Sequence, residues 1–304
     1  MKLVAVAGVL VGVGLSGVAH ADDPLARPEA FDVDREAPPP GQAEFSFDGG
    51  GSVAGWAVGA QLGYLDRPLR LHTTQIKIFP VHRRETLALG GAYMLTPAFL
   101  VDVRMPFSHQ SGDRLIDLGD QRPLDPWVAG DLGIGMRLRL ADRDAFSIFV
   151  RANLTFGTGN DYQFAGESRY TAAWSLIGRF RLPEHIVLAG SLGVRFRGEE
   201  VIVADRVLSD ELVGALGASY QLPAIRGLYC DANEVRLTVE LHGVLGNDVG
   251  DFEGASPAEA RVGVVSRIRP WLAVAARLGK GIDDHIGAPT LRGMLEVVYV
   301  GGAR

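Results

Sequence analysis

The sequence WVAGDLGIGMRLRL at Trp127–Leu140 decides the fold. Apolar residues and one glycine occupy every second position from Val128, and the positions between them, from Asp131 onward, carry Arg137, Arg139 and two more glycines. Successive side chains of a β-strand point to opposite faces, so the pattern predicts a strand with one apolar face and one face of charged and small residues. At 14 residues, the segment is longer than strands in soluble domains usually are.

The same alternation recurs along the chain in twelve segments of ten or more residues. They are approximately 53–65, 83–95, 98–107, 127–140, 145–158, 169–182, 185–197, 208–222, 234–245, 258–268, 271–280 and 290–300. A tilted strand crosses a bilayer with about 9 to 11 residues, and single-chain bacterial barrels have an even number of strands. The fold class predicted is therefore all-β: a closed, antiparallel, up-and-down transmembrane β-barrel of about 12 strands.

The connections between these segments alternate in length. The short ones are 95–97, 141–144, 182–185 and 269–270, and the long ones are 66–82, 108–126, 158–168, 198–207, 246–257 and 281–289. Outer-membrane barrels alternate short periplasmic turns with longer external loops. Only 223–233 departs from this alternation, because it has medium length where a short turn is due. The pattern predicts that both chain ends lie in the periplasm.

Composition excludes several other classes. The chain of 304 residues is 47% hydrophobic and 22% charged, with 39 glycines and a net charge of -6. Its one cysteine, Cys230, permits neither an intramolecular disulfide nor a multi-cysteine zinc site, and no cofactor motif is present. The negative charge and the lack of a basic patch argue against nucleic acid as a partner. After the N-terminal segment, no apolar run approaches the roughly 18 residues that a transmembrane helix requires.

The N-terminus has the pattern of an export signal. Lys2 precedes an apolar stretch over 3–18, and Ala19-His20-Ala21 is a small-residue cleavage site. We expect residues 1–21 to be a signal peptide that is cleaved after Ala21. A membrane anchor is the alternative, but glycines interrupt the apolar stretch and no stop-transfer cluster follows it.

Residues 22–51 are rich in proline and glycine and poor in aliphatic residues. Such a segment buries too little apolar surface to offset its chain entropy, so a flexible periplasmic leader is expected there. The barrel is expected to occupy 52–304.

Aromatic residues often lie toward the ends of the predicted strands, on the apolar face. They are Trp56, Tyr64, Tyr93, Trp127, Trp174, Phe180, Tyr220, Trp271 and Tyr299. Barrels place such residues in girdles at the two membrane interfaces. Trp174 fits this pattern less clearly than the others.

The opposite face of the strands supplies the candidate solute pathway. Its residues are Asp102, Arg104, Asp131, Arg137, Arg139, Arg151, Arg179, Arg181, Arg195, Arg236, Glu240, Arg261, Arg277, Arg292 and Glu296, and Arg197, Glu211, Glu259 and Arg267 complete the face. Thirteen of these side chains are arginines and six are acids. Twelve tilted strands enclose a backbone radius of about 12 Å. Inward arginines would narrow that bore to a small channel that favours anionic solutes.

Other functions stay open. The same charges could pair into a network that fills the lumen and only stabilises the barrel, since buried charges need partners. A surface-binding role for the acidic long loops is a second alternative. Glu240 with His242, or Ser108 with His109, could belong to a barrel-embedded hydrolase, but no complete catalytic arrangement is visible and no enzyme is expected. A soluble sandwich is disfavoured by the strand length, the Arg- and Gly-rich second face and the loop asymmetry.

Several short motifs carry a resemblance to a known group. They are GASPAEA at 254–260, GKG at 279–281, IGAPTLR at 286–292, VDVRMPF at 101–107 and LTFGTGND at 154–161. With these, most of 52–300 resembles Gram-negative outer-membrane barrels of the porin or transporter type, including members linked to uptake of aromatic compounds. Such barrels often precede an OmpA-like peptidoglycan-binding domain, which is not expected here because the sequence ends at Arg304.

The resemblance implies passive transport and gives no catalytic residues. We expect the partners to be outer-membrane lipid and lipopolysaccharide, the barrel assembly machinery and small solutes, with anions preferred.

Overall fold

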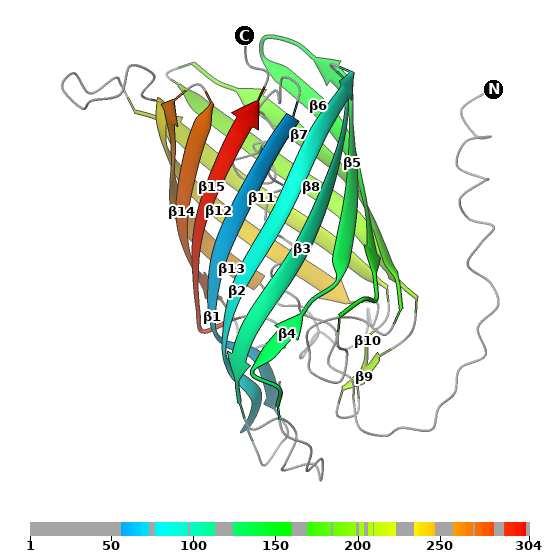
Figure 1. Ribbon diagram of the computed structural model, residues 1–304. Coiled ribbons are helices and arrows are strands. Elements are labelled where there is room, and N and C mark those ends of the chain that lie inside the picture. The colour runs from blue at the N-terminus through cyan, green and yellow to red at the C-terminus, as the bar shows by residue number, and fades with distance from the viewer. Residues whose placement is uncertain are drawn as a thin grey trace, which may run out of the picture.

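A computed structural model describes residues 56–72, 77–96, 98–112, 124–159, 169–183, 185–198, 201–203, 206–208, 210–222, 234–246, 258–269, 271–282 and 289–301. These residues form one closed barrel of antiparallel strands (Figure 1). No helix within them is long and apolar enough to cross a membrane. The predicted signal peptide, the leader, the 223–233 connection, Cys230 and most of the acidic loop residues lie outside the described residues.

Thirteen strands make up the barrel sheet. They are β1 (Trp56–His72), β2 (Lys77–Thr96), β3 (Phe99–Ser111), β4 (Trp127–Ala129), β5 (Leu132–Asp142), β6 (Phe146–Phe156), β7 (Thr171–Arg181), β8 (Ile186–Arg197), β11 (Glu211–Gln221), β12 (Glu234–Gly246), β13 (Ala258–Arg269), β14 (Leu272–Gly281) and β15 (Leu291–Gly301). Each strand pairs with its neighbour along the chain, and β1 pairs with β15 to close the ring. Because β4 and β5 both pair with β3 and form one crossing, the barrel has the twelve crossings that the sequence predicts.

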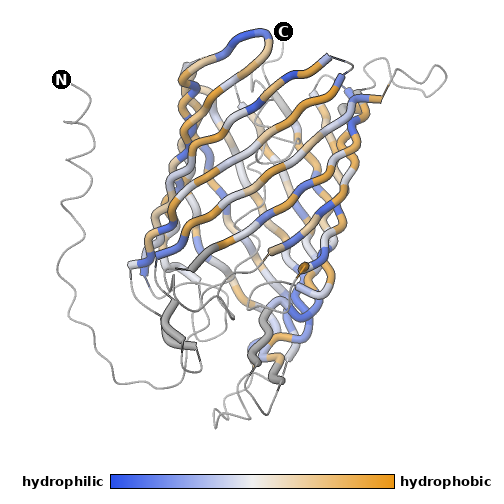
Figure 2. The backbone as a smooth tube through the Cα atoms, turned by 180° about the vertical axis from the view of Figure 1, so that it is seen from behind, coloured by the Kyte–Doolittle hydropathy of each residue, from blue (hydrophilic) through white to orange (hydrophobic). Residues whose placement is uncertain are grey.

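The two faces of the strands sort as predicted. In β15, Leu295 is 49% exposed, whereas its neighbours on the other face, Arg292 and Glu296, are 1% and 3% exposed. Leu216, at the centre of β11, is 66% exposed. Figure 2 shows this alternation of apolar and polar residues along the strands. An apolar outer surface around a polar interior is the surface of a membrane-spanning barrel, with lipid in contact with the outer face.

An aromatic cluster lies at the seam where the barrel closes. The rings of Trp56 and Tyr299 lie 5.6 Å apart, and those of Trp271 and Tyr299 lie 5.5 Å apart. Tyr93 is paired with Trp56 on the neighbouring strand. All four face outward, close to the short-turn ends of their strands. They form one part of the predicted interfacial girdle.

The prediction of one continuous strand over Trp127–Leu140 is wrong at Gly130 and Asp131. These two residues lie between the end of β4 and the start of β5. Ala129 pairs with Phe107 and Gly133 with Arg104, so β4–β5 carries one residue more than β3 over this interval. Such a bulge changes which face each side chain meets. Val128, predicted to face outward, is consequently buried.

Three predicted long connections contain several residues of strand, and in one of them, 108–126, β3 continues to Ser111. The 66–82 segment continues the β1–β2 ladder to the pair His72 and Lys77. In the 198–207 region, β9 (Val201–Val203) pairs with β10 (Arg206–Leu208), so the strand predicted from residue 208 begins at Glu211. Backbone hydrogen bonds form the ladders of the 66–82 and 198–207 segments, and in the first of them Pro80 and Val81 are buried. Neither segment shows the ten-residue alternation of apolar and polar residues that predicts a membrane crossing.

The lipid-facing position of Leu216 can be tested by substitution. Leu216→Arg places a charge at the middle of the outer face and should lower the free energy of unfolding by about 2–4 kcal/mol. Leu182→Arg, beside a short turn at the expected interface, should cost no more than about 1 kcal/mol. Guanidinium titration of protein refolded into lipid vesicles measures both values. Equal costs at the two positions would contradict the assignment of the outer face.

Candidate solute pathway

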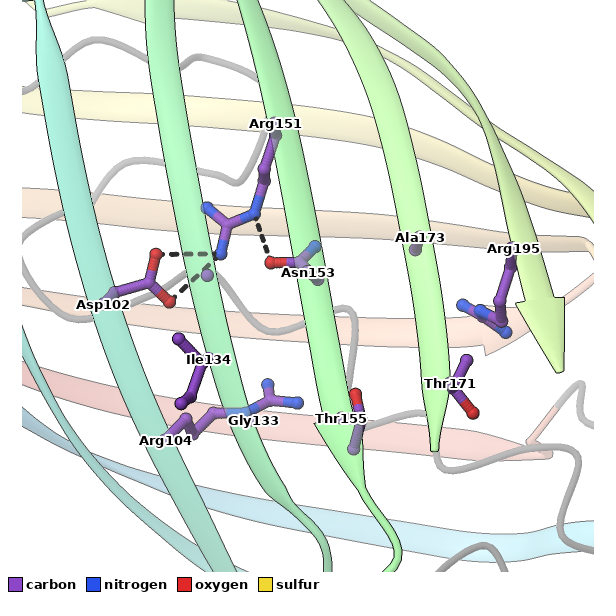
Figure 3. Close-up of a pocket in the computed structure, with 11 residues that line it drawn as sticks. Asp102, Arg104, Gly133, Ile134, Arg151, Asn153, Thr155, Thr171, Ala173 and Arg195 are labelled. Carbon is purple, nitrogen blue, oxygen red and sulfur yellow. Dashed lines mark hydrogen bonds and ion pairs between the residues drawn. The ribbon is translucent and has the colours of Figure 1, made fainter. Parts of the chain in front are cut away.

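A cavity of about 70 Å³ opens on the inner wall, over β3 and β5 to β8 (Figure 3). Its lining residues are Asp102, Arg104, Gly133, Ile134, Gly135, Arg151, Asn153, Thr155, Thr171, Ala173 and Arg195. Four of the predicted pathway residues therefore meet in one place, although up to 93 positions separate them in the sequence (195 minus 102).

The strand register explains why there is a hollow at this point. One row of paired residues runs Arg104, Gly133, Thr155 and Thr171, and the next runs Asp102, Gly135, Asn153, Ala173 and Arg195. Paired residues lie side by side on one face. The first row continues from Thr171 to Arg197. Each row thus has short side chains in its middle and charged side chains at its ends, so the middle of the rows leaves space between the charges.

One ion pair shapes the cavity at its β3 side. The Arg151 Nη2 atom donates to both Asp102 carboxylate oxygens at 3.2 Å, and its Nε atom donates to Asn153 Oδ1 at 2.9 Å. A Cβ atom at Gly135 would overlap the Asp102 carboxylate. The glycine therefore makes room for the ion pair.

Arg195 approaches the cavity from the other side and donates to Glu211 Oε2 at 2.9 Å. The other Glu211 oxygen accepts a hydrogen bond from Arg197 Nη2 at 2.8 Å. Glu211 is only 3% exposed. It thus orients the guanidinium of Arg195 from outside the cavity.

The inner wall over β12 to β15 is organised differently, as a buried ion-pair wall. Glu259 accepts hydrogen bonds from Arg261 Nε at 2.9 Å and from Arg292 Nε at 2.7 Å. Arg277 approaches two more acids, with Nε 3.5 Å from Glu240 Oε1 and Nη1 3.3 Å from Glu296 Oε2.

His242 Nε2 lies 2.6 Å from Glu240 Oε2 in the same wall. The three arginines and three glutamates are each at most 5% exposed. The formal charges of these six residues cancel.

Glycines also make this wall possible. A Cβ atom at Gly279 would overlap Glu259, and one at Gly263 would meet Thr238 and Arg277 within 3 Å. The long side chains pack over these glycines from neighbouring strands. Part of the glycine excess in the composition thus lies beneath lumen charges.

Arg139 and Arg181 lie at the mouth of the barrel, beside the short turn between β5 and β6. They donate to Asp142 Oδ2 at 2.7 Å and to Asp142 Oδ1 at 3.3 Å, respectively. Asp142 also accepts a hydrogen bond from Ser147 at 2.7 Å. That bond, together with those from Arg181 and Arg139, holds the pKa of Asp142 below its ordinary value, against the opposing effect of burial.

The other predicted pathway residues are dispersed. Asp131 accepts a hydrogen bond from the Gly159 backbone N–H at 2.8 Å, beside the β4–β5 bulge. The guanidinium of Arg137 lies 5.2 Å from the centroid of the Phe149 ring. Arg179 is buried and Arg236 is half-buried on the inner face, away from the cavity lining.

The sequence interpretation missed several inner residues. Arg84, which lies within the predicted segment 83–95, donates to Gln110, which lies beyond the predicted segment 98–107, at 2.9 Å on the inner face of β2 and β3. Two inner patches are apolar: Phe149, Ile177 and Ala189 form one, and Ala57, Ala92, Leu100, Val265, Ala273, Ala275 and Val298 form the other. Alternation assigns a face but not its polarity, because small apolar side chains also occur on the inner face.

The hydrolase alternative receives no support from Ser108 and His109. Ser108 is buried and its Oγ lies 2.9 Å from Thr86 Oγ1, whereas the His109 ring contacts the Trp127 ring in a tilted arrangement with 4.7 Å between centroids. Adjacent strand residues point to opposite faces, so these two side chains do not meet. His242 and Glu240 do meet, within the ion-pair wall.

Two solved structures with a similar fold are an outer-membrane channel and a porin. The COG4313 outer membrane channel from Pseudomonas putida F1 superposes with a TM-score of 0.54 at 14% identity, over 81% of this chain and 95% of that chain. The NanC porin superposes with a TM-score of 0.50 at 5% identity, over 80% of this chain and 98% of that chain. The chain has the fold of an outer-membrane channel. No protein-family model matches the sequence, and no curated protein matches it either.

The role of Gly135 can be tested with two alanine substitutions. Gly135→Ala should force the Asp102 carboxylate away from Arg151 and lower the free energy of unfolding by about 1–3 kcal/mol, a usual cost of overpacking. Gly243→Ala is the matched control, because nothing lies within 4 Å of its added Cβ. Guanidinium titration in vesicles should separate the two variants. Equal stability would show that the ion pair does not depend on the space above Gly135.

Removing one charge of the ion-pair wall should be costly. Glu259→Gln leaves Arg261 and Arg292 without their shared carboxylate, and breaking a buried pair in this way costs about 3–5 kcal/mol. Glu85→Gln removes one partner of an exposed pair, 3.8 Å from His109, and should change stability little. The same titration measures both, and a small effect of Glu259→Gln would mean that water reaches the wall.

Proposed function

We propose that this protein is a passive pore of the outer membrane for small solutes and that its lumen prefers anions. One observation carries the proposal: the cavity lining holds three guanidinium groups, from Arg104, Arg151 and Arg195, and one carboxylate, from Asp102. Their sum is an excess of two positive charges beside an open space. Positive charge along a pore attracts anions and repels cations.

The distribution of charge across the two walls supports a pathway for anionic solutes along one side of the lumen. The ion-pair wall over β12 to β15 is neutral, and its charged side chains bond to one another. The excess positive charge lies over β3 and β5 to β8. A solute that follows this side meets the guanidinium groups of the cavity, whereas the three arginines of the ion-pair wall are sealed against glutamates. The fold likeness to outer-membrane channels agrees with a transport role and does not identify the solute.

Conductance in planar lipid bilayers tests the pore. The purified protein should give single-channel events, and in a salt gradient the reversal potential should indicate preference for chloride over potassium. Arg104→Gln removes one cavity charge and should move the anion-to-cation permeability ratio toward one. Arg143→Gln, a matched charge removal in an exposed short turn, should leave the ratio unchanged. An unchanged ratio in Arg104→Gln would show that ions do not pass the cavity.

A structural barrel with a filled lumen is the second candidate. It is favoured by the near-complete burial of the six charged residues in the ion-pair wall. In that case repeated preparations that show the gel-mobility shift of a folded barrel would give no channel events. Such a result would overturn the pore and support the scaffold.

A further inference from the structure

Among the cavity residues, Thr171 has an unusual environment. The residue is 3% exposed and its hydroxyl has no hydrogen-bond partner in the described part of the chain. Burying a hydroxyl without a partner is costly, and because Thr171 belongs to the cavity lining, a ligand in the cavity would supply the missing partner. Thr171 lies in the same row of paired residues as Arg104 and next to the row that contains Arg195 (Figure 3).

The neighbouring guanidinium groups indicate what the partner carries. Arg195 donates to Glu211 through Nη1, and Arg151 donates to Asp102 and Asn153 through Nη2 and Nε. A guanidinium has five N–H donors in a planar fork, so both arginines retain donors beyond these bonds. Such forks match the two oxygens of a carboxylate.

The charge and size of the cavity narrow the class further. Asp102 is part of the lining and offsets one of the three guanidinium charges, so the net charge of the cavity suits an anion. A volume of about 70 Å³ holds about five to seven water molecules at 10–15 Å³ each. This space fits a molecule of about that number of non-hydrogen atoms, which is the size of a small monocarboxylate.

Resting on the pore function proposed above, we propose that the cavity is a binding site for a small hydroxylated monocarboxylate. The carboxylate lies against the guanidinium groups of Arg104, Arg151 and Arg195, and the solute hydroxyl bonds to the hydroxyl of Thr171. The site lies along the positively charged side of the lumen, and it binds this class of solute more tightly than it binds chloride.

Calorimetric titration of the folded, detergent-solubilised full chain tests the site with three probes: lactate, propionate and inorganic phosphate. Lactate and propionate differ by one hydroxyl. One neutral hydrogen bond corresponds to about a threefold to tenfold difference in affinity, so lactate should bind more tightly than propionate by that factor. Phosphate binding as tight as that of lactate, or equal affinities for lactate and propionate, would overturn the assignment.

Thr171→Val removes the hydroxyl with little change in shape, and it should make the affinities for lactate and propionate equal while propionate binding is retained. Thr238→Val is the matched control, because Thr238 is also buried with an unpartnered hydroxyl but does not line the cavity. The control should keep the preference for lactate. A retained preference in Thr171→Val, or its loss in Thr238→Val, would overturn the role of Thr171. The gel-mobility shift shows that each variant is folded.

Calorimetry also separates this inference from the pore itself. Lactate binding without conductance would support the site and overturn the pore. Conductance without lactate binding would support the pore and overturn the site.

Discussion

The structure depends on the absence of water from the membrane interior. Each backbone N–H and C=O group of a membrane-crossing strand must find its partner in another strand, and a sheet satisfies this demand only if it has no edge. The pairing of β1 with β15 removes that edge over eleven consecutive residue pairs, from Trp56 with Gly301 to Asp66 with Leu291. Closure then separates an outer surface, which faces lipid, from an inner surface, which faces the lumen.

Inside the barrel, side-chain size decides where charge is neutralised and where space remains. At Gly135 the missing Cβ accommodates the Asp102 carboxylate, and at Gly279 it accommodates Glu259. Over β12 to β15 the charged groups lean across such glycines onto one another and form closed pairs. Over β5 to β7 the short residues come in adjacent rows, so the charges at the row ends cannot fill the space between them. The same residue types therefore give a sealed wall on one side and a cavity on the other.

The strand crossings and their two faces were predictable from sequence because both follow from a local rule. Alternation along Leu132–Leu140 assigned the apolar residues to the outer face and the arginines to the inner face, and the structure confirms this. The rule failed at Val128, because one extra residue at the β4–β5 bulge reverses the faces. It also gave no sign of the β1–β2 extension, where Pro68 and Pro80 interrupt the alternation.

The candidate site was predictable as a set of residues but not as an arrangement. Sequence placed Arg104, Arg151, Arg277 and Arg292 together on the inner face without distinguishing them. By itself, then, the sequence determined the fold class, the number of crossings and the face of most residues, because each depends on a period of two within one strand. Only the tertiary structure decided that Arg151 lines a cavity while Arg292 is sealed against Glu259. That outcome depends on the register between strands, and register is a relation between segments that no single segment encodes.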